Sequence, residues 1–225
     1  MGIFAITLMV CSASLALAGI PDVTMCSSNR WMDSSGFDRG ILLVVPGSAA
    51  DHPFTAAVEV GQPVGAPQVV FDATIEVIVR DGSGTAIANY PAEDIWIECP
   101  AAPNPVGDPD TAVGLQACIG GAIADQSTDV TGYTLFQNPK FMGGQSFGDT
   151  RVVINGNGLL NTVNVSYNSP DVDGDGVVNL VDLQAFTADF FDAPVYHYRS
   201  DFFYDGIVNL IDLPQMAKFY GSICP

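Results

Sequence analysis

Basic residues are scarce in this sequence. Seven Lys and Arg stand against 25 Asp and Glu in 225 residues, which gives a formal net charge of −18 at pH 7. Nucleic acids and anionic membrane surfaces are bound through clustered Lys and Arg, because phosphate charge must be neutralised. We therefore expect neither nucleic acid nor a membrane surface among the partners. An acidic excess favours either simple solubility or a need for divalent cations.

Residues that commonly catalyse reactions or hold zinc are also few. The histidines are His52 and His197, neither of which belongs to a nucleophile motif such as GxSxG, and no CxxC pair is present. Glu76 and Glu98 alternate with apolar residues, so we interpret them as outward-facing strand residues rather than as the carboxylate pair of a glycoside hydrolase. The sequence predicts a protein that is not an enzyme.

Residues 1–18 form an apolar, uncharged stretch that ends in Ala16-Leu17-Ala18. A small-x-small pattern after such a stretch is typical of a signal-peptide cleavage site. We expect residues 1–18 to be removed and the mature chain to be secreted, extracellular or at the cell surface. After cleavage no segment is expected to be inserted in a membrane.

Four cysteines remain after residue 18, namely Cys26, Cys99, Cys118 and Cys224. An even number in an exported chain favours two disulfides, and three pairings are possible. Of these we favour Cys99–Cys118, which would close a loop rich in Pro and Gly. Cys26–Cys224 would then tie the start of the mature chain to its end.

Short apolar stretches separated by turn residues predict a β protein. Glycine and proline are plentiful (23 and 15), and hydrophobic residues make up 48% of the chain. Strands are expected at 41–45, 71–80, 94–99, 128–136, 150–155 and 161–167, with a turn opening the fourth, a hairpin joining the last two, and residues 100–118 forming a loop. This pattern predicts an antiparallel β-sandwich over residues 19–168.

Three stretches resemble, in their order, the immunoglobulin-like modules of exported bacterial surface proteins. They are IEVIVRDGSGTAI (75–87), TDVTGYTLF (128–136) and TRVVINGNG with NTVNVSY (150–167). The resemblance implies an immunoglobulin-like (Ig-like) sandwich of the kind that serves as a spacer or an adhesive surface.

After Pro170 a pattern of acidic residues occurs twice. In residues 171–183, DVDGDGVVNLVDL, oxygen-bearing side chains occupy positions 1, 3, 5, 9 and 12 and glycine occupies position 6. Ca²⁺ prefers six to eight oxygen ligands, and this spacing wraps one loop around it. Residues 201–213, DFFYDGIVNLIDL, repeat the pattern thirty residues later, except that Phe203 occupies position 3.

The pattern predicts two Ca²⁺ sites, each with side-chain ligands and one backbone carbonyl. Because Phe203 cannot ligate, we expect the second site to bind more weakly or to use a water molecule. The predicted ligands are Asp171, Asp173, Asp175, Asn179, Asp182 and the carbonyl of Val177 in the first loop, and Asp201, Asp205, Asn209, Asp212 and the carbonyl of Ile207 in the second.

A helix is expected after each loop, at 180–191 and 210–220, with Asn179 and Asn209 as N-caps. Pro214 lies near the start of the second helix and would disturb its first turn. A loop with only its exiting helix, given twice, resembles a dockerin over residues 171–221. We therefore interpret residues 169–225 as a small α-helical, dockerin-like module with two EF-hand-like calcium loops.

The resemblance to dockerins implies a cohesin partner whose choice depends on loop positions 10 and 11. These are Leu180-Val181 and Leu210-Ile211, all apolar. One interpretation is a hydrophobic surface that docks onto a cohesin-like or Ig-like protein, within a polysaccharide-degrading or cell-surface assembly. Another is that the same residues are buried against the chain's own sandwich.

Two further interpretations stay open. The chain could assemble with copies of itself into an extracellular filament or surface layer, with the calcium module packed on its own or a neighbouring sandwich. A lesser alternative is a carbohydrate-binding module with Trp31 or Trp96 as a stacking platform. Since Trp96 stands between Ile95 and Ile97, it is more simply interpreted as a core residue of the sandwich.

Overall fold

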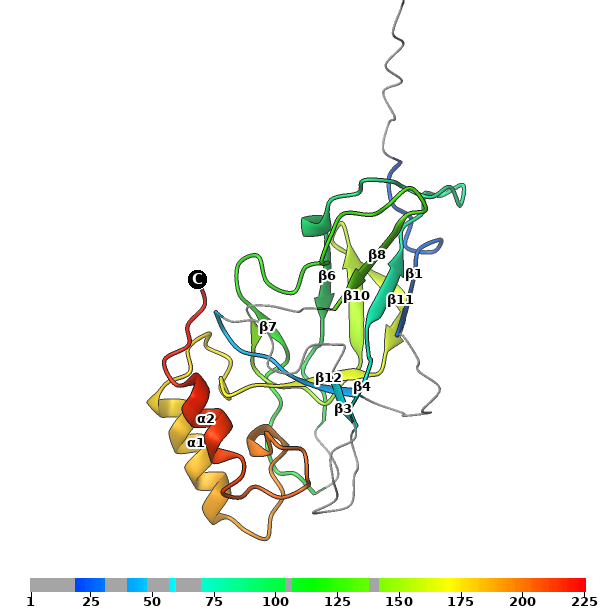
Figure 1. The fold of residues 1–225 in the computed structure, drawn as a ribbon. Helices are drawn as coiled ribbons and strands as arrows, with labels where there is room; N and C mark the ends of the chain where they lie inside the picture. The colour runs from blue at the N-terminus through cyan, green and yellow to red at the C-terminus, as the bar shows by residue number, and fades with distance from the viewer. Residues whose placement is uncertain (1–18, 31–39, 48–56, 60–69, 104–106, 138–141) are drawn as a thin grey trace, which may run out of the picture.

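The computed structural model describes residues 19–30, 40–47, 57–59, 70–103, 107–137 and 142–225. The chain is mainly β: antiparallel sheets come first, and two α-helices follow near the C-terminus (Figure 1). The expected signal peptide at 1–18 and Trp31 lie outside the described residues. Within those residues, neither helix has the length and apolar character that crossing a membrane requires.

Two three-stranded antiparallel sheets share one hydrophobic core. One has the order β1 (Ser27–Arg30), β5 (Ile75–Ile78), β8 (Tyr133–Phe136), and the other β11 (Asn157–Val163), β10 (Thr150–Ile154), β6 (Ile95–Glu98), which follows a short 3₁₀ turn, η2 (Ala92–Asp94). Successive side chains of a strand point to opposite faces, so every second residue is buried. The shared core includes Ile75, Val77, Ile95, Ile97, Phe136, Val152 and Ile154.

The predicted hairpin forms between β10 and β11, and it turns at Asn155 and Gly156, whose φ angles are 49° and 76°. The strand expected at 71–80 is divided into β4 (Val70–Phe71) and β5. The carboxylate of Asp72 accepts hydrogen bonds from the backbone amide and hydroxyl of Thr74, and this side-chain turn interrupts the strand. The strand expected at 161–167 likewise divides at Asn164 into β11 and β12 (Val165–Asn168).

A third sheet has the order β12, β2 (Gly40–Leu43), β3 (Ala57–Glu59), β4, and β12 runs parallel to β2. The chain from β2 to Val45 is buried on both sides. Leu42 and Val44 belong to the core of the first two sheets, whereas Ile41, Leu43 and Val45 belong to a second core. Burial on both faces explains the uninterrupted apolar run, and β2 is a wall that the two cores share.

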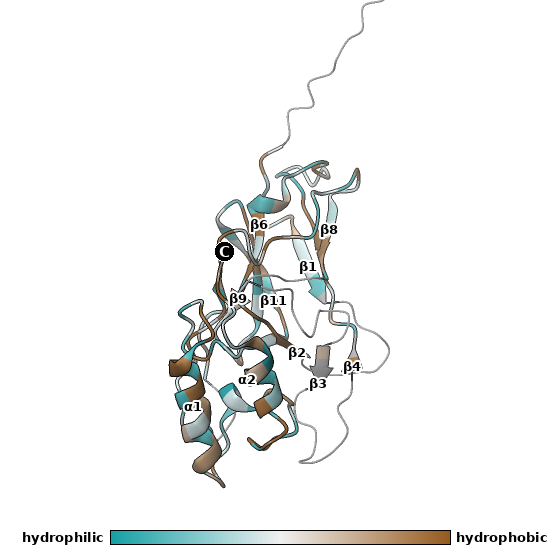
Figure 2. Ribbon diagram, turned by 60° about the vertical axis from the view of Figure 1, so that its left-hand side comes forward, coloured by the Kyte–Doolittle hydropathy of each residue, from teal (hydrophilic) through white to brown (hydrophobic). Residues whose placement is uncertain are grey.

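The second core forms where the chain after β12, which we call the C-terminal region, packs on the side of β2 that carries Ile41 and Leu43. This region contains α1 (Leu180–Phe191), the 3₁₀ turn η3 (Tyr198–Ser200) and α2 (Leu213–Phe219), and the two helices lie side by side in both views (Figures 1 and 2). Phe186 stacks on Phe202, with ring centroids 5.9 Å apart. The buried residues contributed by the C-terminal region are Val172, Val178, Phe186, Tyr198, Phe202, Tyr204, Val208, Met216 and Phe219.

Helix α1 has the predicted bounds and begins after the predicted N-cap Asn179. The second helix begins at Leu213 instead of residue 210, because residues 210–212 form a turn. Pro214 then occupies one of the first helical positions, where its missing N–H costs nothing. Asn209 is therefore not the N-cap of α2, which the structure places at Asp212.

A short antiparallel ribbon, β7 (Gln116–Ala117) and β9 (Met142–Gly143), interrupts the predicted loop at 100–118. Cys118, directly after β7, forms a disulfide with Cys224. The favoured pairing of Cys99 with Cys118 and of Cys26 with Cys224 is therefore wrong. Cys26 and Cys99 are thiols buried in the core of the first two sheets, whereas Cys118 faces the C-terminal tail.

Candidate metal centre

The first calcium-type loop is curled around the carboxylate of Asp171, at position 1. Its two oxygens accept hydrogen bonds from the backbone amides of Asp175 and Gly176, with N···O distances of 3.1 and 3.0 Å. Asp171, Asp173 and Asp175 each present a carboxylate oxygen, and these atoms lie within 4.8 Å of one another. The loop thus gathers three of the predicted ligands around one point.

Asp182, at position 12, closes the same loop. One carboxylate oxygen accepts from the amide of Val172 at 2.7 Å, and the other from the amide of Asn179 at 2.8 Å. The Asn179 side chain in turn accepts from the amide of Val181 at 2.7 Å, which completes a capping box at the start of α1. The residues that would hold the ion therefore also begin the helix.

The second loop repeats these contacts. The carboxylate of Asp201 accepts from the amides of Asp205 and Gly206 at 3.2 and 2.9 Å. Asp212 accepts from the amide of Asn209 at 2.9 Å. Two segments that begin thirty residues apart therefore fold into the same carboxylate-centred loop.

The loops differ at position 3, as the sequence predicts. In the first loop the carboxylate of Asp173 accepts from the amide of Asp175 at 3.2 Å. In the second loop Phe203 supplies no side-chain oxygen, and its own amide donates to Asp212 at 2.8 Å. Weaker binding at the second loop stays a prediction that rests on this missing oxygen.

Four aspartates in the two loops are almost fully buried: Asp171, Asp182, Asp201 and Asp212 are at most 1% exposed. Burial, reinforced by neighbouring carboxylates, raises the pKa of Asp171 and of Asp201 to about 7 and that of Asp212 to about 6. Burial also raises the pKa of Asp182. Buried carboxylates are disfavoured unless a cation compensates them, and clustered oxygen donors suit Ca²⁺. The donor set therefore fits calcium.

The four apolar residues at loop positions 10 and 11 are on the surface. Leu180, Val181, Leu210 and Ile211 are 56%, 53%, 69% and 50% exposed. The interpretation that they are buried against the chain's own sheets is therefore wrong. The C-terminal region contacts β2 through a different set of residues, because loop positions 2 and 8 point into the second core.

An apolar groove lies between the two helices. It is lined by Leu183 from α1 and by Leu213, Met216, Ala217 and Tyr220 from α2 and its end. Figure 2 shows apolar segments on both helices. We call the exposed residues at loop positions 10 and 11, together with the residues that line this groove, the helical face.

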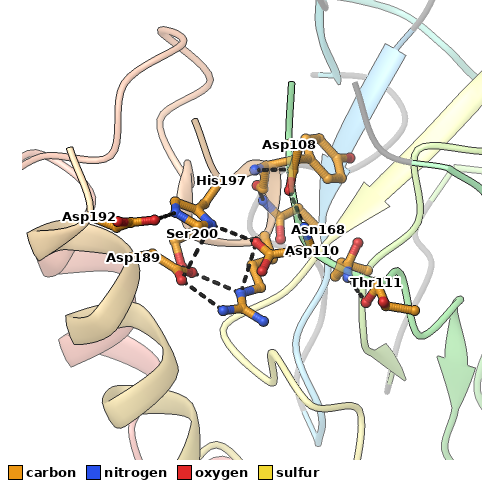
Figure 3. A network of polar contacts seen from close by, with 11 residues as sticks. Asp108, Asp110, Thr111, Asn168, Asp189, Asp192, His197 and Ser200 are labelled. Atoms are coloured by element: carbon orange, nitrogen blue, oxygen red, sulfur yellow. Dashed lines mark hydrogen bonds and ion pairs between the residues drawn. The ribbon is translucent and has the colours of Figure 1, made fainter. Parts of the chain in front are cut away.

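A charged network that the sequence did not predict joins the C-terminal region to the loop before β7 (Figure 3). His197, only 4% exposed, contacts Asp110 at 2.9 Å, Asp192 at 3.2 Å and Asp189 at 3.4 Å. Arg199 forms two hydrogen bonds with Asp189, at 2.7 and 2.8 Å, and lies 3.1 Å from Asp110. His197 and Arg199 thus connect Asp110, in the loop before β7, with Asp189 and Asp192 at the end of α1.

Asp108, Asp110 and His197 also have the spacing of a metal site. However, Asp108 accepts from the backbone amide of Tyr198 at 2.7 Å, and Asp110 is paired with His197 and Arg199. These donor atoms are used within the protein, and Arg199 supplies a positive charge. We therefore interpret the cluster as a latch between segments. His197 and Asp110 are 87 residues apart, and no local pattern in the sequence indicates their contact.

The latch should make stability depend on pH through His197. Burial opposes protonation of His197, but Asp110, Asp189 and Asp192 outweigh it, so the pKa is raised above its usual 6.5. A raised pKa means that the stabilising contribution is complete below pH 6.5 and is lost as the pH rises through the raised value. Under saturating calcium, and above the pH at which the carboxylate partners become protonated, the stability difference between the natural chain and His197→Gln should be largest at about pH 6 and should narrow on raising the pH. A difference independent of pH in chemical denaturation would contradict the latch.

Trp96 is half-buried on the outer face of β6, opposite Ile95 and Ile97, which fill the core. Its indole N–H donates to Glu98 on the same face at 3.3 Å. The interpretation of Trp96 as a core residue is therefore wrong, because strand alternation places it with the outward residues.

Comparison with protein-family models, with curated proteins and with solved structures finds no match to this chain. The features of the molecule that bear on its function are therefore the two loops and the helical face.

Proposed function

We propose that this chain is a secreted calcium-binding protein without catalytic activity, which docks onto another protein outside the cell. In this proposal residues 19–168 are an Ig-like β-sandwich and residues 169–225 a dockerin-like module. The observation that carries it is the repetition of one loop geometry, in which buried aspartates accept the same backbone hydrogen bonds at both sites.

Bound Ca²⁺ supplies the positive charge that the buried carboxylates require. In the first loop Asp171, Asp173, Asp175, Asn179, Asp182 and the carbonyl of Val177 would hold it, and in the second Asp201, Asp205, Asn209, Asp212 and the carbonyl of Ile207. Leu180 and Val181 lie between two of these ligands, positions 9 and 12. Fixing the ligands therefore fixes the apolar residues between them, which makes docking dependent on calcium.

The expected partner is a cohesin-like or Ig-like domain with an apolar surface of its own. The helical face is exposed on both repeats, and exposed apolar patches of this kind commonly mark interaction sites. Isothermal titration of the mature chain with calcium tests the first half of the proposal. Two binding events, the second weaker, are expected, and the absence of heat and of calcium uptake would refute it.

The docking half is tested on the helical face itself. The double substitution Val181→Asp and Ile211→Asp should weaken binding to a purified cohesin domain by about a hundredfold, because two apolar contacts are replaced by buried charges. Calcium binding by the same variant is measured by calorimetry, so that loss of docking is separated from loss of calcium. Leu160→Asp is the matched control, since Leu160 is 81% exposed on β11. Equal affinity of the two variants, measured by surface plasmon resonance, would show that the helical face is not the docking site.

Self-assembly is a second candidate function, and the same face supports it. An apolar surface on a chain of net charge −18 would associate with another copy more readily once calcium reduces the repulsion. Calcium would then produce filaments or large homo-oligomers visible by electron microscopy, whereas a docking module stays monomeric until its partner is added. A carbohydrate-binding role through the outward Trp96 is a lesser candidate, which binding to a glycan array would favour.

A further inference from the structure

The last residues of the chain pair with the first calcium loop through backbone hydrogen bonds. The amide of Cys224 donates to the carbonyl of Gly176, and the amide of Val178 donates to the carbonyl of Ser222, both at 2.8 Å. The amide of Gly221 donates to the carbonyl of Val178, also at 2.8 Å. The tail, which we define as residues 221–224, therefore runs antiparallel to loop positions 6–8.

Position 7 of the loop, Val177, lies at the centre of this pairing and is bridged to Ile223. Its backbone carbonyl is the one main-chain ligand that the pattern predicts. The direction of a carbonyl is set by the peptide planes around it, and both flanking residues, Gly176 and Val178, are hydrogen-bonded to the tail. The carbonyl of Val177 itself accepts from the Asn179 side chain at 3.1 Å, and the tail holds the peptide groups on either side of it.

The tail is held in turn by the rest of the protein. Cys224 is covalently joined to Cys118 next to β7. Gly47, which follows β2, lies so close that a Cβ added there would be 2.0 Å from the carbonyl oxygen of Ile223. A Cβ added at Gly176 would be 2.9 Å from the sulfur of Cys224. The disulfide is thus packed against the loop itself.

The ribbon of β7 and β9 holds the start of the same loop. The amide of Gly144 donates to the backbone carbonyl of Asp171 at 3.0 Å. A Cβ added at Gly143 would lie 1.8 Å from the Asp171 carboxylate, so the ribbon touches the position 1 ligand. The loop is enclosed by the ribbon and the tail, and the Cys118–Cys224 bond joins the two.

The second loop is supported differently: the Asn168 side chain donates to the carbonyl of Asp201 at 3.3 Å, and the Tyr196 hydroxyl donates to the Asp201 carboxylate at 3.1 Å. Within the part of the chain that the structure describes, residues 206–208 make no backbone hydrogen bond to another segment. The two loops therefore share their internal contacts but differ in what surrounds them.

We infer that the Cys118–Cys224 disulfide is a positioning device for the first calcium site. By anchoring the tail it holds the Val177 carbonyl in the orientation for calcium, so the oxidised chain binds calcium at loop one more tightly than a chain without the bond. This inference rests on the proposed calcium binding. Only calcium binding at the first loop depends on the disulfide, and calcium binding at the second loop is independent of it.

The test separates the two loops by calorimetry. Asp205→Ala leaves loop one as the intact site, and Asp171→Ala, which removes the carboxylate at the centre of loop one, leaves loop two. In the Asp205→Ala background, adding Cys224→Ser or Cys118→Ser should raise the Kd for calcium by about tenfold, because the tail that pairs with Gly176 and Val178 is no longer anchored and the loop is less preorganised. In the Asp171→Ala background the same changes should shift the Kd by no more than about twofold. Cys26→Ala, a thiol outside the tail, is the matched control and should change neither.

A measurement on the natural chain keeps the inference testable if a variant fails to fold. Coupling between two sites is reciprocal, so calcium must stabilise the disulfide by the factor by which the disulfide strengthens calcium binding. At equilibrium, dithiothreitol passes two electrons and two protons to the Cys118–Cys224 disulfide, which becomes two thiols. Dithiothreitol itself is oxidised to its cyclic disulfide. Calcium should lower the reduced fraction.

The outcomes are distinct. A natural chain that takes up no calcium refutes the proposed function. The positioning role alone is refuted by a chain that binds calcium at both loops, if its affinity at loop one is the same with and without the disulfide and its reduced fraction is the same with and without calcium.

Discussion

Chelation of calcium should unfold the C-terminal region of the mature chain before its sheets. The buried Asp171, Asp182, Asp201 and Asp212 would then lie close together without a compensating cation. At calcium concentrations a thousandfold above its Kd, each site contributes about 4 kcal/mol of stability that the chelator removes. Hydrogen exchange should therefore show protection lost first across α1 and α2, while β5 and β6 stay protected.

Two controls sharpen this experiment. Asp171→Ala should remove most of the calcium-dependent protection of the first loop, whereas Asp149→Ala, at an exposed acid before β10, should leave it intact. Mg²⁺ should not replace Ca²⁺, because it demands a smaller and stricter octahedral set of ligands. If chelation lowers protection equally in the sheets and in the helices, calcium does not act through the loops.

Leu43→Ala should cost about 2–5 kcal/mol, the usual range for a fully buried leucine, and should loosen the C-terminal helices most. Leu43 is 0% exposed and points from β2 into the second core. Leu42→Ala removes the same atoms from the neighbouring residue, which points into the first core. Chemical denaturation should therefore give similar losses in the free energy of unfolding for the two variants. Hydrogen exchange should show that protection is lost mainly in the helices for Leu43→Ala and mainly in the first two sheets for Leu42→Ala.

Leu160→Ala, on the surface of β11, serves as the control and should change stability by less than about 0.5 kcal/mol. Identical protection patterns for Leu42→Ala and Leu43→Ala would show that β2 does not divide two cores.

The sequence predicts best what is local. All the side-chain ligands of a loop fall within twelve residues, and the capping box of Asn179 and Asp182 spans four, so spacing alone indicates their contacts. The hairpin at Asn155 and Gly156 is local in the same sense. The start of α2 was missed because Pro214 suits either a kink or a first turn, and only the turn at 210–212 decides between them.

What depends on distant contacts could not be predicted. Four cysteines allow three pairings, and Cys118 meets Cys224 across 106 residues only because β7 lies beside the tail. An apolar run such as the one at 41–45 predicts a buried strand, but it does not say that Leu42 and Leu43 serve different cores. Exposure of Leu180 and Leu210 likewise follows from which other residues cover β2.

The passage from sheets to calcium loops is very short. Strand β12 ends at Asn168 beside β2, and Asp171, at position 1 of the first loop, follows three residues later. Only Ser169 and Pro170 lie between the strand and the loop. The latch at His197 and the disulfide at Cys224 connect the two regions at two further places. A partner bound on the helices would therefore be held in a fixed orientation relative to the sheets, whereas a module on a flexible linker would leave that orientation free.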